Sequence, residues 1–175
     1  DLKIYTLKVA KICLGTKNSG PAMAAFGPAK SMACVAFNAP LQVMETPIPA
    51  LKGSEVLVRN LYAGVCHSDV HIAEGAVGGF KMSEKLPLVL GHEMEGEVVA
   101  LGPDVHDKSI IGKTFAVYPW LGCDQASCLH CAPGEYNLCD NRSVPTQKFC
   151  DGKSMFGGYS SHVIVPDPKY LIDTT

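Results

Sequence analysis

Short runs of alternating apolar and polar residues, separated by glycine and proline, fill most of the chain after residue 31. An alternation with a period of two is typical of strands that bury one face. The pattern predicts a short helix over residues 68–74, with Ser68 or Asp69 near its N-cap. Many short strands with little helix indicate a mainly β, barrel-like domain of the β-rich α+β class. The predicted strands cover residues 33–38, 41–47, 55–65, 94–101, 114–118 and 160–165.

The first 31 residues differ from the rest of the chain in charge. They hold five lysines and one acid, giving +4, whereas the remaining residues hold ten bases and sixteen acids, giving −6 and a total of −2. Lysines interrupt the apolar residues early in this segment, so no secretory apolar region forms. A transit peptide and a poorly ordered extension both remain open, and the glycines and prolines favour the extension. We predict an N-terminal extension over residues 1–31 and one domain over residues 32–175.

Composition narrows the possible functions further. Apolar residues make up 47% and charged residues 18%, which is enough to build a core. The net charge of −2 argues against a nucleic-acid partner, and no run of about 18 apolar residues predicts a membrane span. Eight cysteines and six histidines are the unusual counts, and they raise two possibilities, disulfide bonds or metal sites.

Four cysteines lie close together in the chain, at positions 123, 128, 131 and 139. Four thiolates in one short loop suit a tetrahedral zinc ion that stabilises the loop and leaves no position open for substrate. Two disulfides, an iron–sulfur cluster or a chance cluster are the alternatives. The spacing favours structural zinc, because it differs from that of common ferredoxins and nothing indicates secretion.

A second candidate site combines the segment Gly-Val-Cys66-His67-Ser68-Asp69-Val-His71 with Gly91-His92-Glu93. Cys66 ends a predicted strand and His92 precedes another, so a thiolate and an imidazole that converge there would supply two ligands to a catalytic zinc. Taken singly, each residue has a simpler interpretation. A lone cysteine is usually a small buried apolar residue, and a lone histidine is more often at the surface or in the core than a ligand.

Residues 32–175 resemble the N-terminal, GroES-like catalytic domain of the zinc-containing medium-chain alcohol dehydrogenases. Three motifs carry the resemblance in the family's order: Gly-Val-Cys-His-Ser-Asp, then Gly-His-Glu-x2-Gly-x5-Gly-x2-Val after Leu-Pro-Leu-Val-Leu, then the four cysteines. The resemblance implies a GroES-like irregular β-barrel that carries a zinc-binding, cysteine-rich lobe and a few short helices.

The resemblance also assigns residues around a catalytic zinc. Cys66 and His92 match the family's first two ligands, and Glu93 matches an acidic residue behind the metal that approaches it during ligand exchange. Asp69 matches the carboxylate that holds the histidine ligand by a hydrogen bond. Such a partner fixes the histidine tautomer and raises its basicity.

Three further residues match a proton relay and a cofactor contact. Ser68 matches the hydroxyl that receives the proton of the substrate alcohol, and His71 matches the histidine that passes it towards solvent. His67 lies where a basic residue approaches the cofactor pyrophosphate. Without the resemblance, Ser68 reads as an N-cap and both histidines as parts of a solvated helix face.

The chain departs from the family in several ways. No glycine-rich dinucleotide fingerprint is present in these 175 residues, so we expect this chain to lack the cofactor domain, and the resemblance implies that the third zinc ligand would fall beyond residue 175. Four residues separate Cys123 from Cys128 where the family commonly has two, which makes Cys123 the least secure lobe ligand. We predict that Cys150 is structural rather than a substitute ligand. Cys13 and Cys34 fall outside every motif and are expected to be ordinary thiols.

The resemblance implies part of a cytoplasmic, zinc- and NAD- or NADP-dependent oxidoreductase that oxidises an alcohol to an aldehyde or ketone. The partner is then a small alcohol or carbonyl compound, and homo-oligomers form only with the missing cofactor domain. This chain alone is expected to be incomplete and inactive. The alternatives are a stand-alone zinc-binding β-domain that acts as a scaffold, and a co-chaperonin, which needs no metal ligands.

Overall fold

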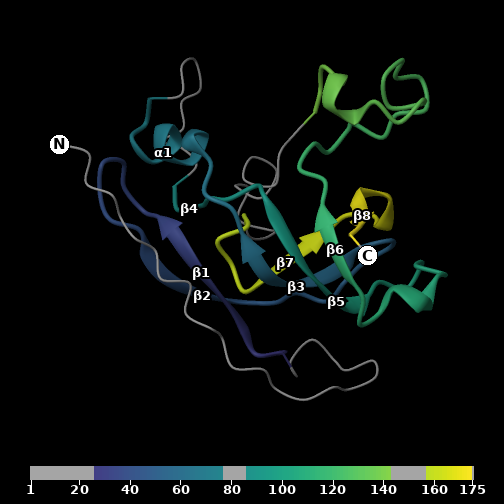
Figure 1. Cartoon of the computed structure of the whole chain (residues 1–175), viewed down its shortest axis with the longest axis horizontal. Coiled ribbons are helices and arrows are strands. Elements are labelled where there is room, and N and C mark those ends of the chain that lie inside the picture. Colours follow the sequence, from purple (N-terminus) through teal and green to yellow (C-terminus); the bar gives the residue numbers. More distant parts are fainter. Residues whose placement is uncertain (1–25, 77–85, 143–156, 175) are drawn as a thin grey trace.

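The computed structural model describes residues 26–76, 86–142 and 157–174, and these form two antiparallel sheets with one short helix (Figure 1). Three short 3-10 turns at Lys108–Ile110, Tyr136–Leu138 and Pro168–Tyr170 complete the described elements. The strands and the helix follow in chain order: β1 Pro28–Cys34, β2 Gln42–Pro47, β3 Val56–Ala63, α1 His67–Ala73, β4 Leu88–Val89, β5 Met94–Leu101, β6 Thr114–Val117, β7 His162–Val165 and β8 Leu171–Asp173.

The smaller sheet has the strand order β2-β1-β4, and the larger has the order β7-β3-β5-β6-β8. The segment that leads into β7 joins the two sheets. Ser31 of β1 forms an isolated antiparallel bridge with Ser160, and their hydroxyls lie 2.8 Å apart. The backbone N–H of Met32 also donates to the carbonyl of Tyr159 at 2.8 Å. These bonds join the two sheets, and the many short strands with little helix confirm the predicted β-rich, GroES-like fold class.

The main core lies on the inner face of the larger sheet. Along β5, buried and half-buried residues alternate over all eight positions, as a period of two requires. Val56 and Val58 of β3 pack there with Val98 of β5, and all three are fully buried. Burying each such side chain contributes about 1.5–3 kcal/mol, so this cluster is the platform that holds the strand ends in place.

The first predicted strand was misplaced. The sequence pattern predicted it over residues 33–38, whereas β1 begins at Pro28 and ends at Cys34. The inner face of β1 carries Ala29 and Ser31, which are too small or too polar to mark a buried face in the pattern. Residue Asn38 has a φ of 55°, which no strand residue adopts. The strand therefore starts inside the predicted extension 1–31.

The other predicted strands lie within a few residues of the observed ones, and β5 matches over its whole length. The sequence pattern did not predict β4 or β8, which are only two and three residues long. The loop expected over residues 75–79 lies partly outside the described residues.

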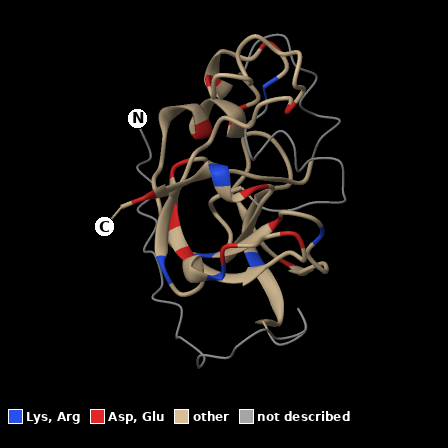
Figure 2. Ribbon diagram, turned by 90° about the vertical axis from the view of Figure 1, so that its right-hand side faces the viewer, with Lys and Arg blue, Asp and Glu red and all other residues tan. Residues whose placement is uncertain are grey.

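Positive and negative residues are interspersed along the described ribbon rather than gathered on one side (Figure 2). This agrees with the small net charge of the chain. Among the described residues, no helix has the length and apolar character needed to cross a membrane.

Candidate metal centres

The pairing of β3 with β5 sets the first candidate centre. In this antiparallel ladder the last residue of β3, Ala63, faces the first residue of β5, Met94. The backbone N–H of Gly64 then donates to the carbonyl of Glu93 at 2.7 Å. Cys66 lies just beyond the end of β3, and His92 lies just before β5, so the ladder brings these two distant segments of the sequence together.

Three metal-binding side chains converge at these strand ends. The ligand atoms of Cys66, His92 and Glu93 all lie within 4.8 Å of one another. Cys66 and His92 are half-buried, whereas Glu93 is exposed. A Cβ atom at Gly64 would collide with the Glu93 carboxylate, so a glycine here leaves room for that side chain. The resemblance placed Glu93 behind the metal and close enough to approach it during ligand exchange, and the structure places its carboxylate within 4.8 Å of the other two ligand atoms.

Asp69 contacts both Cys66 and His92 of this centre and is almost fully buried, with 3% of its surface exposed. Its Oδ1 lies 3.4 Å from Nδ1 of His92 and accepts a hydrogen bond from the backbone N–H of Gly91 at 2.9 Å. Its Oδ2 accepts from the backbone N–H of Cys66 at 3.1 Å and from the Tyr159 hydroxyl at 3.0 Å. With Nδ1 facing the carboxylate, Nε2 of His92 is the nitrogen available to a metal.

The helix that carries Ser68 and Asp69 begins at His67, one residue earlier than predicted. Cys66, rather than Ser68 or Asp69, is the N-cap of α1, and Asp69 is its third helical residue. Cys66 adopts an extended backbone with φ −89° and ψ 149°, as is usual for an N-cap residue. The carboxylate of Asp69 satisfies the free N–H at this helix end as the acid of a capping box does.

The predicted relay residues lie on α1. The Ser68 hydroxyl lies 3.3 Å from Nε2 of His92, on the side where a metal would bind. The rings of His67 and His71 pack together with centroids 4.4 Å apart, and both histidines are exposed. Across residues 26–76, 86–142 and 157–174, no hydrogen bond joins Ser68 to His71, so the relay stays a prediction.

The second centre is the cysteine lobe, which we define as residues 119–142. It stands apart from the two sheets in Figure 1, where it is the light green segment. The structure brings all four predicted cysteines together, with every sulfur within 4.8 Å of the others. The sulfurs of Cys123 and Cys131 lie 3.8 Å apart, and those of Cys128 and Cys139 lie 3.9 Å apart.

These distances discriminate between the alternatives left open by the spacing. A disulfide would hold two sulfurs about 2.05 Å apart, and all four lobe cysteines are free thiols. An iron–sulfur cluster would separate the thiolates by several iron and sulfide atoms. A tetrahedron with zinc–sulfur bonds of about 2.3 Å has edges of about 3.8 Å. The lobe therefore fits a single zinc ion.

The electrostatics of the lobe also favour a cation. Backbone N–H groups, that of Cys131 first and then that of His130, lower the pKa of the Cys128 thiol to about 6. A hydrogen bond to the backbone of Gln125 lowers the pKa of the Cys123 thiol, but burial and the other three sulfurs together outweigh it and raise this pKa to about 12. Four neighbouring thiols cannot all ionise unless a positive ion compensates their charges.

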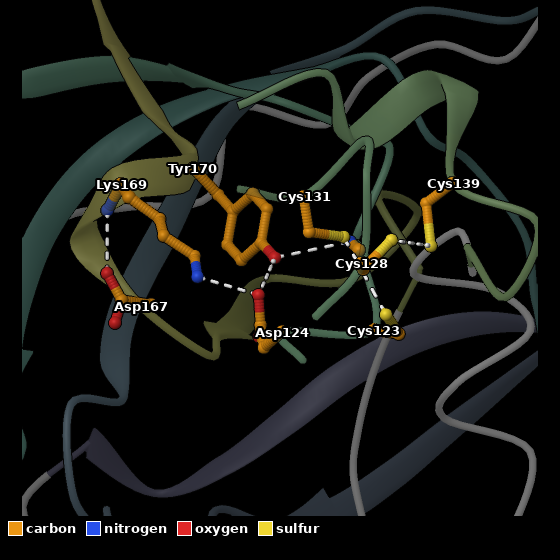
Figure 3. Close-up of polar contacts among 9 residues, drawn as sticks. Cys123, Asp124, Cys128, Cys131, Cys139, Asp167, Lys169 and Tyr170 are labelled. Atoms are coloured by element: carbon orange, nitrogen blue, oxygen red, sulfur yellow. Dashed lines mark hydrogen bonds and ion pairs between the residues drawn. The ribbon is translucent and has the colours of Figure 1, made fainter. Parts of the chain in front are cut away.

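A polar network attaches the lobe to the barrel (Figure 3). Tyr170 is fully buried, and its hydroxyl accepts from the backbone N–H of Gly122 at 3.2 Å and donates to Oδ1 of Asp124 at 3.0 Å. The same oxygen of Asp124 binds the ammonium group of Lys169 at 2.7 Å. Burial first, and then the Asp124 carboxylate, raise the pKa of Tyr170. This network flanks Cys123, the ligand that the spacing made least secure.

The donors in the first centre fit zinc of the catalytic kind. Thiolate, imidazole and carboxylate are common zinc ligands, and a three-ligand site leaves a fourth position for water or substrate. Cys34 is fully buried between Leu88 and Leu90 and belongs to neither centre. Cys13 and Cys150 lie outside the described residues.

Comparison with known proteins assigns the fold to a family. Residues 52–174 match the model of the alcohol dehydrogenase GroES-like domain. The chain belongs to this family. The resemblance seen in the sequence motifs is thereby confirmed, and the strand ends, the helix α1 and the lobe are those of an alcohol dehydrogenase GroES-like domain.

Two curated relatives and one solved structure show how far the similarity extends. The chain is 40% identical over 146 residues to an NAD-dependent alcohol dehydrogenase of Sulfurisphaera tokodaii, covering 81% of this chain and 40% of that protein. It is 37% identical over 127 residues to an alcohol dehydrogenase of Geobacillus stearothermophilus, covering 72% and 34%. The D-arabinose dehydrogenase structure from Sulfolobus solfataricus superposes with a TM-score of 0.66 at 30% identity, covering 83% of this chain and 40% of that one. The chain thus spans about 40% of the length of such relatives.

Sequence reasoning missed several residues that support the two centres. Tyr159 and Gly91 contact Asp69, and Tyr170 with Asp124 supports the lobe. Only Gly91 and Asp124 stand next to predicted ligands in the sequence, directly before His92 and directly after Cys123. Gly91 could have been found from its place in the Gly-His-Glu motif. Its φ of 90° is a conformation that favours glycine, which explains why a glycine stands there.

Proposed function

We propose that this chain is the catalytic-domain part of a zinc- and NAD- or NADP-dependent alcohol dehydrogenase that converts an alcohol to an aldehyde or ketone. One observation carries the proposal: Cys66, His92 and Glu93 converge within 4.8 Å, and a buried carboxylate faces the second nitrogen of the histidine. A scaffold would need the closed four-cysteine site alone. It would have no use for a half-exposed centre with mixed donors and an adjacent hydroxyl.

In this proposal Cys66, His92 and Glu93 hold the zinc ion, which when bound lowers the pKa of an alcohol that binds at its open position. Asp69 keeps the proton of His92 on Nδ1, so that Nε2 faces the metal position. Ser68 lies 3.3 Å from Nε2, where its hydroxyl can accept the alcohol proton. His71 stands three residues further along α1, on the same helix face, and we assign it the transfer of that proton to solvent.

The remaining assignments concern the cofactor, the structural zinc ion, the cellular location and the partners. We assign His67, exposed at the start of α1, to contact with the cofactor phosphates. Cys123, Cys128, Cys131 and Cys139 hold a structural zinc ion. We place the protein in the cytoplasm, where thiols stay reduced, and expect neither nucleic acid nor a membrane as partner. Homo-oligomers are proposed only with the cofactor domain.

The experimental test is whether the Cys66 centre binds a metal with an open coordination position. The chain is loaded with two equivalents of Co²⁺, and its visible spectrum is compared with that of Cys66→Ala. We expect one set of bands to depend on Cys66, and we expect alcohols, aldehydes or imidazole to shift those bands.

The matched control is Cys34→Ala, which removes a thiol that belongs to neither centre. It should leave both the spectrum and its response to ligands intact. A Cys66-dependent spectrum that no added ligand changes would indicate a closed site and contradict a catalytic role. Identical spectra for the native chain and Cys66→Ala would contradict the metal centre itself.

A further inference from the structure

Tyr159 reaches the Asp69 carboxylate from a distant part of the chain. Its hydroxyl donates to Oδ2 of Asp69 at 3.0 Å, across 90 positions of sequence. No motif identified in the sequence includes Tyr159, and neither the ligands nor the relay residues require it. Its position beside the carboxylate that faces His92 suggests a role in the metal centre.

The hydrogen bond from Tyr159 completes the set of partners around Asp69. A carboxylate offers about four lone-pair positions. Backbone N–H groups of Gly91 and Cys66 occupy one on each oxygen, and Nδ1 of His92 faces Oδ1. The Tyr159 hydroxyl takes the remaining position on Oδ2. With all four positions taken, the carboxylate has one orientation, and that orientation determines where the His92 ring lies.

The main chain holds Tyr159 on both sides. Its N–H donates to the carbonyl of Leu90 at 2.9 Å, and its carbonyl accepts from the N–H of Met32 at 2.8 Å. Its ring lies against Gly91, where an added Cβ would come within 2.7 Å of the ring. The hydroxyl is therefore fixed relative to the segment that carries His92, rather than being a flexible surface group.

The hydroxyl also stays protonated. Burial first, and then the charge of Asp69, raise the pKa of Tyr159 well above its usual range. The Tyr159 hydroxyl therefore remains a hydrogen-bond donor at neutral pH. A donor on Oδ2 draws negative charge towards that oxygen and holds the carboxylate plane, while Oδ1 remains directed at His92.

We propose that Tyr159 is a positioning residue of the metal centre: through Asp69 its hydroxyl orients the His92 ring and so raises the metal affinity of the Cys66–His92–Glu93 site. The inference rests on the proposed function, because it assumes that this site binds a metal. Removal of an outer-shell partner of a histidine ligand typically costs 10–100-fold in affinity. Tyr159 acts one bond further out, so we expect about a threefold to tenfold loss.

The test uses Tyr159→Phe, which keeps the ring and removes only the hydroxyl. Co²⁺ is titrated into the native chain and the variant, and the Cys66-dependent bands give the affinity of this site separately from the lobe. The control is Tyr118→Phe, which removes a hydroxyl that bonds Asn137 at the surface. We expect weaker cobalt binding in Tyr159→Phe only.

A second readout reports the orientation directly. Nitrogen-15 NMR of the metal-free chain shows which ring nitrogen of His92 carries the proton. We expect the Nδ1–H tautomer in the native chain and in Tyr118→Phe, and a mixture of tautomers in Tyr159→Phe. A purely structural role for Tyr159 would lower the melting temperature without changing this mixture.

A double-mutant cycle with Asp69→Asn decides whether the effect passes through Asp69. If it does, Tyr159→Phe has little further effect on cobalt affinity once Asp69 is changed. Equal losses in both backgrounds, or no loss in the single variant, would overturn the inference and leave the metal centre standing. Absence of Cys66-dependent cobalt binding in the native chain would overturn both the inference and the proposed function.

Discussion

The four sulfur atoms of the cysteine lobe come from one loop, whereas the donors of the other centre come from two segments that meet at the ends of β3 and β5. The lobe offers only thiols, and two of them are buried. The other centre offers a thiol, an imidazole and an exposed carboxylate, beside the Ser68 hydroxyl. Four thiolates occupy all the coordination positions of a tetrahedral zinc ion, whereas three mixed donors leave one coordination position open.

The contrast shows two ways in which one small barrel can hold metal ligands. A local loop needs little more than correct spacing, and it gains its order from the ion that it binds. A centre built from separate segments needs a rigid platform and hydrogen-bond partners that orient each ligand. We therefore expect loss of metal from the lobe to affect stability, and loss of metal from the Cys66 centre to affect chemistry.

The largest expected effect is that of Cys128→Ser. Cys128 is the lobe thiol whose pKa is lowered to about 6, so it ionises most readily. The variant should lose one zinc ion per chain, and its melting temperature should fall by about 10 °C, because structural zinc contributes several kcal/mol to folding. Elemental analysis and calorimetry measure the two changes.

The matched variant Cys66→Ala tests whether the Cys66 centre contributes less to stability than the lobe does. It should also lose one zinc ion, but its melting temperature should change by no more than about 3 °C, because the barrel core supports that centre without the ion. A fall as large as that of Cys128→Ser would remove the distinction between a stabilising and a chemical site.

Acid should destabilise the platform that both centres share. His162 of β7 is buried, and burial first, then Arg59, lower its pKa to about 4 from the ordinary value of 6.5. Between these values the unfolded chain binds a proton that the folded chain excludes. The free energy of unfolding of the metal-free chain should therefore fall by about 3 kcal/mol as the pH drops from 6.5 to 4, and should be independent of this group above 6.5.

Urea unfolding at several pH values measures this effect. His162→Gln should flatten the dependence, although it will lower stability at neutral pH, and the exposed His106→Gln is the control that should leave it unchanged. An equally steep dependence in His162→Gln would show that another group causes the acid sensitivity.

Asp69→Asn should weaken zinc binding at the Cys66 centre alone, although Asp69 is not itself a ligand. The amide cannot accept as a carboxylate does from His92, so zinc affinity at the Cys66 centre should fall by about 10–100-fold, while the lobe keeps its ion. Competition with a chelator measures both affinities in one experiment. Asp107→Asn, which alters an exposed carboxylate at a 3-10 turn, is the control and should change neither.

The smallest expected effect concerns the attachment of the lobe. Tyr170→Phe removes the hydroxyl that bonds Asp124 and Gly122, and should lower the free energy of unfolding by about 1–2 kcal/mol. The lobe should also release zinc to a chelator faster. The control Tyr62→Phe removes a hydroxyl from an exposed side chain of β3, outside the lobe, and should cost less than about 0.5 kcal/mol. Equal losses in the two variants would mean that the network does not support the lobe.

The sequence pattern predicted a strand correctly where large apolar side chains on the buried face alternate with charged side chains on the other face. The pattern located β5 to the residue because its buried face carries Met94 and Val98 while its other face carries Glu95 and Glu97. It misplaced β1 because Ala29 and Ser31 bury little surface and do not mark a face. It missed β4 and β8 because two or three residues do not establish a period.

The sequence predicted the cysteine lobe more directly than the Cys66 centre, because the lobe ligands lie close together in the sequence and the other ligands do not. Spacing alone indicated the cysteine lobe, since its ligands are neighbours in sequence. Cys66 and His92 were weak candidates until family motifs joined them. The contact of Tyr159 with Asp69 could not be predicted, because it depends on how three separate segments pack around Gly91.

The pairing register of β3 and β5 also determines the distance between the two ligands Cys66 and His92. One residue of β3, Leu61, bulges out between the pairs Asn60–Gly96 and Tyr62–Glu95, and this shift sets the pairing of the last residues before the ligands. Each residue of slippage along a strand moves a side chain by about 3.4 Å, which exceeds a zinc–ligand bond. One added or deleted residue at this bulge would therefore pull the two ligands out of reach of a common ion. For protein engineering, the bulged strand pair must therefore be kept together with α1 and Tyr159, which hold the Asp69 carboxylate against His92.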